Sequence, residues 1–376
     1  MYLKSIEYRE FEGEPKQWRL EEFSLGDINL LVGKNSTGKS RTLNVISGLG
    51  NLVSQDVKLR YLSGDYKVTF DKNEKPITFS LKYENRKVIE EKLVIGNKVV
   101  LDRGKSGKGS IWLEKNQDYM DFQAPETVLA CVNRRDEVQH PFFKDLNDWG
   151  EGQRHYRFGG SMGGEYLAPI AKEKEDAALN LKDTNLVVQI FDKGRERFPN
   201  FVEDIRHDME MVGFDIDSIE IGVPTSLLPD KSLFMLPKGL IVKESDLPAP
   251  TEQGEVSQGM FRALSLIIQL NYSQMASIPS CILIDDIGEG LDYDRSTALI
   301  KLVIEKAKVS FVQLIMSTND RFVMNNVPLK YWCVTQRLAN TCKIHNYKNA
   351  KEKFDDFELT GLSNFDFFAS EFWQNR

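Results

Sequence analysis

Residues 33–40 read Gly-Lys-Asn-Ser-Thr-Gly-Lys-Ser, which fits the pattern GxxxxGK[ST] and constrains the chain more than any other segment. A compact apolar run at residues 28–32 precedes the pattern, and a helix-like segment at residues 41–49 follows it. Two glycines let the backbone wrap around a phosphate group, with the N–H groups at the helix N-terminus pointing at the anion. We therefore predict a buried strand, a phosphate-binding loop (the P-loop, residues 33–40) and a helix.

The residue types in the P-loop also predict individual contacts. Lys39 would reach the β- and γ-phosphates of a nucleotide, and the Ser40 hydroxyl would ligate Mg²⁺. The nucleotide-binding residues that we expect are Gly33, Lys34, Asn35, Ser36, Thr37, Gly38, Lys39, Ser40 and Arg41.

A second segment with chemical content lies at residues 281–286, where four apolar residues precede two carboxylates. A buried strand that ends in an aspartate can hold Mg²⁺ and its water shell beside a P-loop. Asp285 would be that residue, and Asp286 would lie where a general base orients and polarises an attacking water. The alternative, a strand that ends in a solvated acidic turn, is disfavoured once the P-loop is present.

Two weaker signals lie on either side of this strand. Ser257 and Gly259 stand at the start of a helix predicted over residues 259–277, where a hydroxyl and free N–H groups are offered to an anion. Taken alone, this pattern favours a plain helix N-cap. A strand predicted over residues 309–316 ends in the polar residues 317–320, which are common turn formers.

Taken in order, these four segments resemble the ATP-binding-cassette (ABC) ATPase superfamily, in particular its soluble branch with the SMC and RecF proteins and the standalone ATPases of bacterial anti-phage systems. Residues 256–260 stand where the LSGGQ signature belongs and match it at Ser257 and Gly259. Residues 285–292 overlay D-E-P-x-x-x-L-D, with the D-loop at Asp292, and Asn319 occupies the position of the switch histidine. The resemblance covers about residues 1–50 and 251–337, and it is nearest to the ATPase subunits of PARIS-like and AbiL-like systems.

The resemblance implies an ATPase with ATP and Mg²⁺ as cofactors, in which each ATP is held between two protomers. Lys39, Ser40 and Asp285 would come from one chain, with Ser40 and Asp285 holding the metal. The other chain would supply the signature residues Ser257, Gln258 and Gly259. One copy of each motif per chain therefore requires a dimer or a higher oligomer.

The resemblance implies that Lys39, Asp286 and Asn319 are the catalytic residues. Two of them depart from the family pattern, and both departures predict slow hydrolysis. Asp286 replaces the catalytic glutamate, and its shorter side chain would align a water less well. Asn319 replaces the switch histidine, so it can hydrogen-bond a γ-phosphate but cannot titrate. The Q-loop glutamine stays open between Gln139 and Gln153. Three aromatic residues are candidates for stacking on adenine, although each is more often a core residue: Tyr8, Phe11 and Trp18.

The spacing of the motifs divides the chain into a head and two insertions. We expect the ATPase head to comprise residues 1–65, 126–165 and 251–340, interrupted by a β-rich arm (66–125) and a helical lobe (166–250). The patterns predict strands at 67–70, 77–83, 98–101 and 128–132, then a loop rich in Gly and Arg, then helices at 166–198 and 200–212. The six phenylalanines at residues 354–372 of the tail (341–376) should pack back on the sheet, and a partner-binding stripe is the alternative. The predicted fold is an α/β ABC-type head with a mainly parallel sheet, an N-terminal β arm and an inserted helical lobe.

Composition argues against several classes of function. With 49 basic and 56 acidic residues, the net charge of −7 argues against binding nucleic acid through bulk positive charge. A local phosphate-binding loop stays open, although solvated salt bridges are the more frequent role of such residues: Arg134, Arg135, Arg154, His155 and Arg157. No apolar run approaches the ~20 residues of a bilayer span. The charged first residues and four cysteines without a CxxC pair are typical of a cytoplasmic protein.

We therefore expect an oligomeric, cytoplasmic ATPase that turns over slowly and does not enter a membrane. The resemblance implies that it controls a separately encoded effector protein, a nuclease, as the sensor or scaffold subunit of an anti-phage system. Two alternatives stay open. One is a DNA-repair or DNA-clamping ATPase of the RecF type, and the other is a chain that binds ATP to lock an assembly and hardly hydrolyses it.

Overall fold

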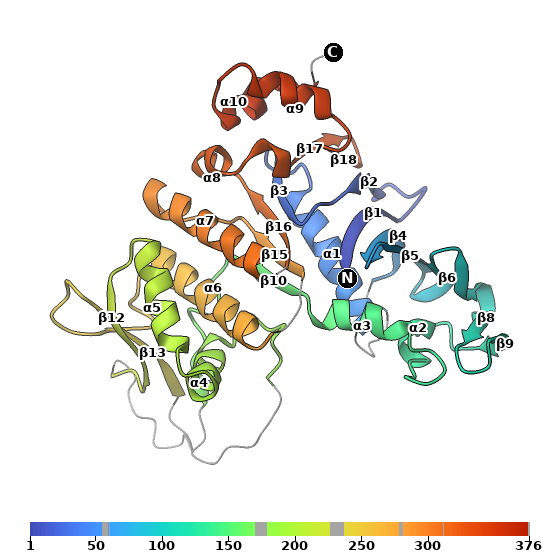
Figure 1. The fold of residues 1–376 in the computed structure, drawn as a ribbon, viewed down its shortest axis with the longest axis horizontal. Coiled ribbons are helices and arrows are strands. Elements are labelled where there is room, and N and C mark those ends of the chain that lie inside the picture. Colours follow the sequence, from blue (N-terminus) through green and yellow to red (C-terminus); the bar gives the residue numbers. More distant parts are fainter. Residues whose placement is uncertain are drawn as a thin grey trace.

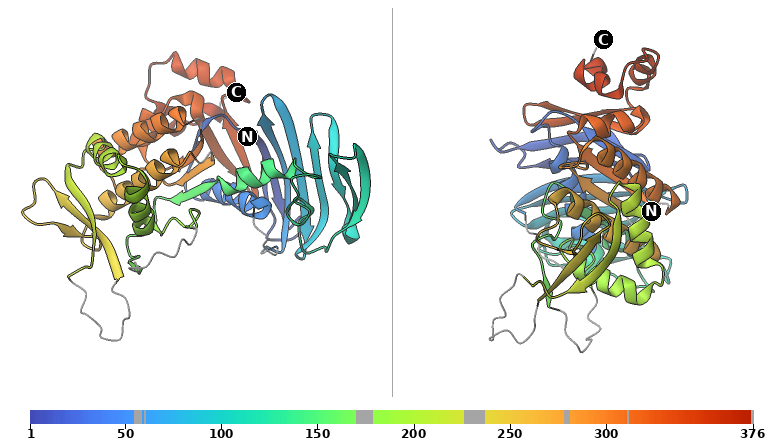
Figure 2. Two further views of the ribbon diagram at one scale, coloured as in Figure 1. Left: turned by 60° about the horizontal axis from the view of Figure 1, so that its bottom comes forward. Right: turned by 90° about the vertical axis from the view of Figure 1, so that its left-hand side faces the viewer.

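The computed structural model describes residues 1–54, 59, 61–169, 179–225, 237–277, 281–310 and 312–374. Its main element is one large sheet, whose strands within this described part follow the spatial order β10 (Arg154–Arg157), β15 (Cys281–Asp285), β16 (Gln313–Thr318), β3 (Ile28–Val32), β17 (Trp332–Leu338), β18 (Thr341–Asn346), β2 (Trp18–Ser24), β1 (Tyr2–Glu10), β4 (Ser63–Lys72), β5 (Lys75–Glu84), β6 (Lys87–Ile95), β7 (Lys98–Arg103), β8 (Lys108–Leu113) and β9 (Asp118–Gln123). Strands β4 to β9 lie at one end of the molecule, and the inserted lobe lies at the other (Figure 1, Figure 2).

The centre of the sheet is parallel and buried on both faces. Strands β10, β15, β16, β3 and β17 run parallel to one another. All residues of β3 and β16 are buried, as expected of strands that helices cover on both sides. Helix α1 (Lys39–Ser54) covers one face, and α6 (Gln258–Met275) and α7 (Tyr293–Val309) cover the other. The strands and helices predicted around the P-loop and around Asp285 are confirmed.

Alternate residues of these strands enter two separate hydrophobic clusters. Leu30 and Ile284 belong to the cluster that α6 and α7 complete, whereas their neighbours Leu31 and Leu283 belong to the cluster that α1 completes. This alternation follows from the period of two in a strand, which sends successive side chains to opposite faces. The sheet therefore separates two cores.

The prediction of a mainly parallel sheet is wrong, because the sheet is mixed. From β1 through β4 to β9, each strand pairs antiparallel with its neighbour. The cause is the chemistry of the turns. The two-residue loops Asn73-Glu74 and Asn85-Arg86 have positive φ at both residues, which is the geometry of a hairpin turn whose twist matches its strands. The predicted β arm is thus a continuation of the main sheet.

Two predictions between the arm and the lobe are also wrong. Residues 128–132 were expected to form a strand, but α2 (Ala130–Asn133) occupies their second half, because the Glu91 carboxylate accepts the N–H groups of Ala130 and Cys131. The expected Gly- and Arg-rich loop contains helix α3 (Phe143–Glu151) and strand β10. Helix α3 packs closely on α1, since a Cβ added at Gly150 would lie 2.4 Å from the Gly50 carbonyl oxygen.

The inserted lobe combines helices and strands, so the description as helical is incomplete. It contains α4 (Val187–Arg197) and α5 (Phe201–Met211) and a small sheet of β11 (Ala168–Pro169), β12 (Ile216–Gly222), β13 (Pro237–Glu244) and β14 (Thr251–Glu252). The helix predicted at 200–212 is confirmed as α5. The one predicted at 166–198 is confirmed only as α4 at its end, and its residues 170–178 lie outside the described residues.

The C-terminal tail folds back onto the head. Beyond α8 (Arg321–Asn326), helices α9 (Lys351–Glu358) and α10 (Asn364–Ala369) lie near β17 and β18 (Figure 1). Phe354, Phe357 and Phe367 are buried in the cluster that contains Trp332 of β17. The prediction for the tail phenylalanines is therefore confirmed. The four cysteines are buried free thiols.

A buried ion pair ties the antiparallel strands to the segment that returns to the head. Glu91 on β6 and Arg103 on β7 face each other, and both side chains are fully buried, with 3.0 Å between Arg103 Nη1 and Glu91 Oε2. Arg103 also donates to the carbonyl oxygens of Pro125 and Val128, at 2.7 Å each. Together with the N–H groups that Glu91 accepts, these bonds fix residues 125–131 on the sheet.

Replacing Glu91 with alanine should lower the free energy of unfolding by about 3–5 kcal/mol, because the Arg103 guanidinium would stay buried without its counter-charge. Urea-induced unfolding measures this change. The matched control is Lys92→Ala in the neighbouring residue, whose ion pair with Asp102 is largely exposed and should contribute less than about 1 kcal/mol. Equal losses in the two variants would contradict the importance of the buried pair.

Candidate functional site

The P-loop connects β3 to α1 and has glycines where the structure leaves no room for a side chain. A Cβ added at Gly33 would lie 2.0 Å from Thr335 Oγ1. Gly38 has a φ of +110°, and a Cβ there would lie 3.2 Å from Cys342 Sγ. Thr335 and Cys342 come from β17 and β18, so the neighbouring strands fix the shape of the loop.

Lys39 is the buried cation of the P-loop. Its side-chain ammonium donates to the carbonyl oxygens of Gly33 at 2.8 Å and Lys34 at 3.3 Å, and only 6% of the residue is exposed. Burial lowers the pKa of Lys39, and the carboxylates of Asp286 and Asp285 oppose this shift. A positive charge is therefore held inside a loop whose N–H groups can bind an anion.

The carboxyl ends of the parallel strands bring the acidic residues to the P-loop. Ile284 of β15 pairs with Met316 of β16, which pairs with Leu30 of β3, so the three strands end at one edge of the sheet. At that edge Asp285 Oδ1 accepts a hydrogen bond from Ser40 Oγ at 3.0 Å.

Ser317 hydrogen-bonds to both aspartates. Sequence reasoning did not predict this role, because a serine in a polar segment at the end of a strand is a common turn former. Its hydroxyl donates to Asp285 Oδ1 at 2.5 Å and accepts the N–H of Asp286 at 3.0 Å. The hydroxyl thus fixes the turn that follows β15, and with it the position of Asp286.

Asp286 combines an unusual backbone conformation with a shifted pKa. Its φ of 56° lies in the left-handed region, which few residues other than glycine adopt and which Asp and Asn tolerate best. Burial raises the pKa of Asp286, the carboxylates of Asp285 and Glu289 add to the shift, and Lys39 opposes it. A carboxylate with a raised pKa is suited to accept a proton from water.

Lys39, Ser40 and Asp286 line one pocket of about 480 Å³, and Asp285 contacts Ser40 without being part of the described lining. Of the predicted residues, the pocket brings together Asn35, Ser36, Gly38, Lys39, Ser40, Arg41, Asp286 and Asn319. Arg337 also lines it, and its guanidinium donates to the Ser36 carbonyl oxygen at 3.3 Å. Sequence reasoning missed Arg337, because an arginine at the end of a strand carries no signal for a place in this pocket. A larger cavity, without P-loop residues among its described lining, lies elsewhere.

Of the three aromatic candidates for stacking on adenine, only one is among the residues described as lining the pocket. Trp18 lines the pocket, and the Arg41 guanidinium lies 4.3 Å from the centre of its ring. Tyr8 is buried against Trp18 and Tyr66, and the ring of Phe11 is covered by the Lys16 ammonium. Neither belongs to the lining that the structure describes, so Trp18 with Arg41 forms the aromatic wall.

The signature and D-loop segments adjoin each other but lie outside the described lining of this pocket. Ser257 is the N-cap of α6 and accepts the N–H of Met260, and a Cβ added at Gly259 would lie 2.5 Å from the Gly290 carbonyl oxygen. Gln258 is exposed in the first turn of α6. Asp292 caps α7 by accepting the N–H of Arg295 at 3.0 Å.

Neither Q-loop candidate is among the described residues that line the pocket. Gln153 is buried against α1, where its Nε2 donates to the Ile46 carbonyl oxygen at 3.3 Å. Gln139 lies beside β8, since its carbonyl oxygen accepts the N–H of Glu114.

Of the basic residues predicted at the Gly- and Arg-rich loop, Arg154, His155 and Arg157 do not share one exposed surface. Arg154 is buried and donates to the carbonyl oxygens of Glu151 and Gln153. Burial lowers the pKa of His155 to about 4, and the positive charge of Arg157 contributes to the same shift. Arg157 is exposed at the end of β10 and donates to Asn44 Oδ1 of α1 at 3.3 Å.

Ser40 and Asp285 fit the requirements of a magnesium ion. Their oxygen atoms lie 3.0 Å apart beside the P-loop, and Mg²⁺ prefers oxygen ligands and takes the remainder from phosphates and water. Within the described residues, no group of three or more His, Cys, Asp or Glu could hold a metal by protein side chains alone.

The described part of the chain contains no helix long and apolar enough to cross a membrane.

No family model matches the chain, and no curated protein matches it. Solved structures do. An SMC head bound to the C-terminal winged-helix domain of ScpA matches with a TM-score of 0.54 and 12% identity, over 92% of this chain and 97% of that one. The chain has the fold of an SMC head.

A second match supports this conclusion. The SMC head domain with an extended coiled coil, bound to the C-terminal domain of ScpA and derived from Pyrococcus furiosus, has a TM-score of 0.51 and 11% identity, over 95% of this chain and 99% of that one. Both matches cover more than nine-tenths of this chain, well beyond the segments whose motifs carried the resemblance. The expected ABC-type head is thus confirmed at the level of the fold.

Proposed function

We propose that the chain binds ATP with Mg²⁺ in the pocket at the P-loop and hydrolyses it slowly. The observation that carries the proposal is the contact between Ser40 and Asp285 beside Lys39, with Asp286 and Asn319 on the wall of the same pocket. This set supplies a cation and N–H groups for the phosphates, two oxygen ligands for a metal, and a carboxylate for a water. The SMC-head fold supports the same assignment.

Each residue has a distinct role in this proposal. Lys39 would leave the carbonyl oxygens of the P-loop and neutralise charge on the β- and γ-phosphates. Ser40 and Asp285 would hold Mg²⁺, whose charge also neutralises the phosphate oxygens. Asp286 would accept the proton of the attacking water, and Asn319 would donate a hydrogen bond to the γ-phosphate. The short side chain of Asp286 reaches less far than a glutamate would, which limits the rate.

We further propose that the complete site forms between two protomers. Ser257 and Gln258 are exposed at the N-terminus of α6, where N–H groups and the helix dipole favour a phosphate. These residues are not part of the described lining of their own pocket. A second copy would therefore bring its signature segment to the P-loop, and ATP turnover per chain should rise with protein concentration.

A mixing experiment tests this arrangement. Lys39→Ala and Ser257→Arg should each abolish turnover, whereas an equal mixture should recover about a quarter of the wild-type rate, because half of the dimers would be mixed and each would hold one intact site. Ser257 is the better target than Gly259, where any side chain would meet the Gly290 carbonyl oxygen. No recovery in the mixture would contradict a site shared between chains.

The cellular role that we propose is control of a separately encoded effector protein, a nuclease, in defence against phage. It rests on the resemblance to anti-phage ATPases and on the SMC heads, which were solved with a bound partner domain. Phage plated on cells that carry the chain with its neighbouring genes should be restricted, and Lys39→Ala should remove this protection. Strong stimulation of turnover by duplex DNA would instead favour the RecF-type alternative.

A further inference from the structure

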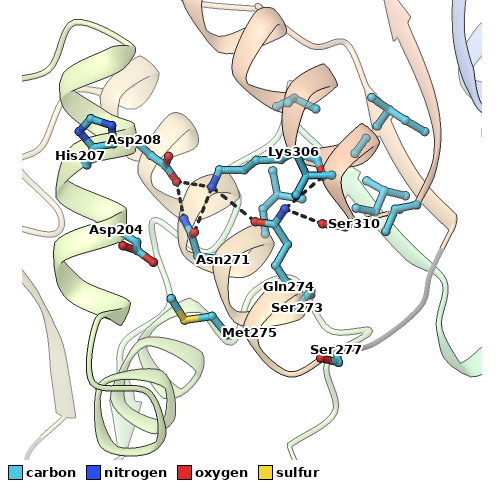
Figure 3. Close-up of a pocket in the computed structure, with 17 residues that line it drawn as sticks. Asp204, His207, Asp208, Asn271, Ser273, Gln274, Met275, Ser277, Lys306 and Ser310 are labelled. Carbon is cyan, nitrogen blue, oxygen red and sulfur yellow. Dashed lines mark hydrogen bonds and ion pairs between the residues drawn. The ribbon is translucent and has the colours of Figure 1, made fainter.

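A second cavity, of about 610 Å³, lies where the lobe meets the head. Its described lining comes from α5 of the lobe, from the C-terminal halves of α6 and α7, and from the first residues of β15 and β16 (Figure 3). It therefore sits at the opposite ends of the strands from the P-loop. Its volume is within the range of small-molecule sites, which occur preferentially between domains.

A polar cluster crosses this cavity from the lobe to the head. Asp208 of α5 and Lys306 of α7 form an ion pair at 2.7 Å, with side chains that are 7% and 17% exposed. Asn271 of α6 donates to Asp208 Oδ2 at 2.6 Å, and the Lys306 ammonium also donates to Asn271 Oδ1 at 3.1 Å and Gln274 Oε1 at 3.4 Å (Figure 3). The donors of Lys306 are thus engaged, and its charge is neutralised.

The cavity keeps an excess of acceptors after these bonds are counted. Both contacts of Asp208 involve Oδ2, so Oδ1 has no partner among the described residues. Asp204 lies one helical turn earlier on the same face of α5 and adds a second, exposed carboxylate. Helices α6 and α7 end at this cavity, and helix C-termini carry partial negative charge. The electrostatics favour a cation.

The remainder of the lining is largely apolar, and its other polar members are His207, Ser273, Ser277 and Ser310. Leu270, Met275, Val303 and Ala307 line the cavity from the helices, and Ile282 and Leu314 line it from the strands. A ligand that only carried charge would leave this surface without a contact. The lining therefore suits a molecule with an apolar body and one cationic end.

We propose that this cavity binds a small organic cation, a primary ammonium or guanidinium group on an apolar body. The cationic group donates to Asp208 Oδ1 and to the Asp204 carboxylate, and the apolar body packs against the helices and strands. Because Asp208 belongs to the lobe and Lys306 to the head, a bound molecule contacts both parts at once. This site does not depend on the function proposed for the P-loop pocket.

Calorimetric titration of the full chain with tyramine and with 4-hydroxyphenylacetate tests the proposal, since the two probes share their body and differ in charge. Tyramine should bind with a dissociation constant of about 10 µM to 1 mM, and the acid should bind at least about tenfold more weakly. Asp204→Lys should weaken tyramine binding at least about tenfold by placing a like charge beside the ammonium. Asp208→Asn is a poorer test, because it leaves Lys306 buried without a counter-charge.

The matched control is Glu210→Lys, which makes the same change of charge at an exposed position of α5 outside the described lining. It should leave the affinity for tyramine within about twofold, because an exposed charge outside the cavity is screened by solvent. Melting temperatures of both variants report whether the fold is intact. Absence of tyramine binding, equal affinity for the two probes, or equal effects of the two lysine variants would overturn the proposal.

Discussion

Replacing Lys39 with alanine should weaken ATP binding by about 30- to 5,000-fold, which corresponds to the roughly 2–5 kcal/mol lost when one partner of a buried charge pair is removed. The ammonium lies inside the P-loop, where the phosphates would replace the carbonyl oxygens that it now contacts. Titration with a fluorescent ATP analogue measures the affinity. The fold should not suffer, because the lowered pKa of Lys39 shows that burial of its charge is unfavourable in the free chain.

Lys34→Ala is the control for this prediction. Lys34 belongs to the same loop, but its side chain is 72% exposed and pairs with Glu371 of the tail. Its loss should change the affinity for ATP by less than about threefold, as expected of a solvent-screened charge. If Lys39→Ala bound ATP as the wild type does, the pocket would not be the nucleotide site. If the two variants lost affinity equally, the effect would be one of net charge.

Replacing Asp286 with asparagine should reduce ATP turnover by at least about 100-fold, the typical contribution of a general base, while ATP binding stays within about threefold. Asparagine has the same shape and also tolerates the left-handed φ of this position, so the backbone should stay in place. It cannot accept the proton of a water. Single-turnover hydrolysis at saturating ATP separates this loss from any change in affinity.

The same residue should set the acidic limit of the activity. The base acts only when it is deprotonated, so turnover should fall as the pH decreases through its pKa. Because burial and the neighbouring carboxylates raise the pKa of Asp286, this fall should begin at a higher pH than for an exposed aspartate. Glu289→Gln is the control. If it abolished turnover and Asp286→Asn did not, Glu289 would be the base.

The P-loop and the strand that carries Asp285 could be predicted because each is encoded by one short, continuous stretch of sequence. Glycine spacing, a lysine and a serine identify the P-loop from a single stretch, and an apolar run followed by Asp285 identifies the neighbouring strand. Parallel strands then bring both to one edge, so that the contact between Ser40 and Asp285 follows from the topology. Ser317 and Arg337 reach the site from other strands, and a serine or an arginine at a strand end carries no signal of its own.

The parts that sequence reasoning missed depend on distant partners. Residues 128–132 have the composition of a strand, and a carboxylate 39 residues away from Ala130 starts a helix there instead. The hairpins at Asn73-Glu74 and Asn85-Arg86 contain no glycine, so their positive φ values were not visible and the mixed sheet was not predicted. Local composition cannot report such long-range contacts.

The two cores on either side of the sheet make the head and its insertions one cooperative unit. Phe191 and Ile205 of the lobe belong to the same cluster as Leu30 of the central strands, and Phe79 of the antiparallel strands belongs to the cluster of Leu31. Within the residues that the structure describes, neither insertion forms a separate core, so removal of either would expose one face of the strands that end at the P-loop. The insertions are therefore not expected to unfold independently of the head. Partial unfolding of the lobe would also destabilise the strand that carries Asp285.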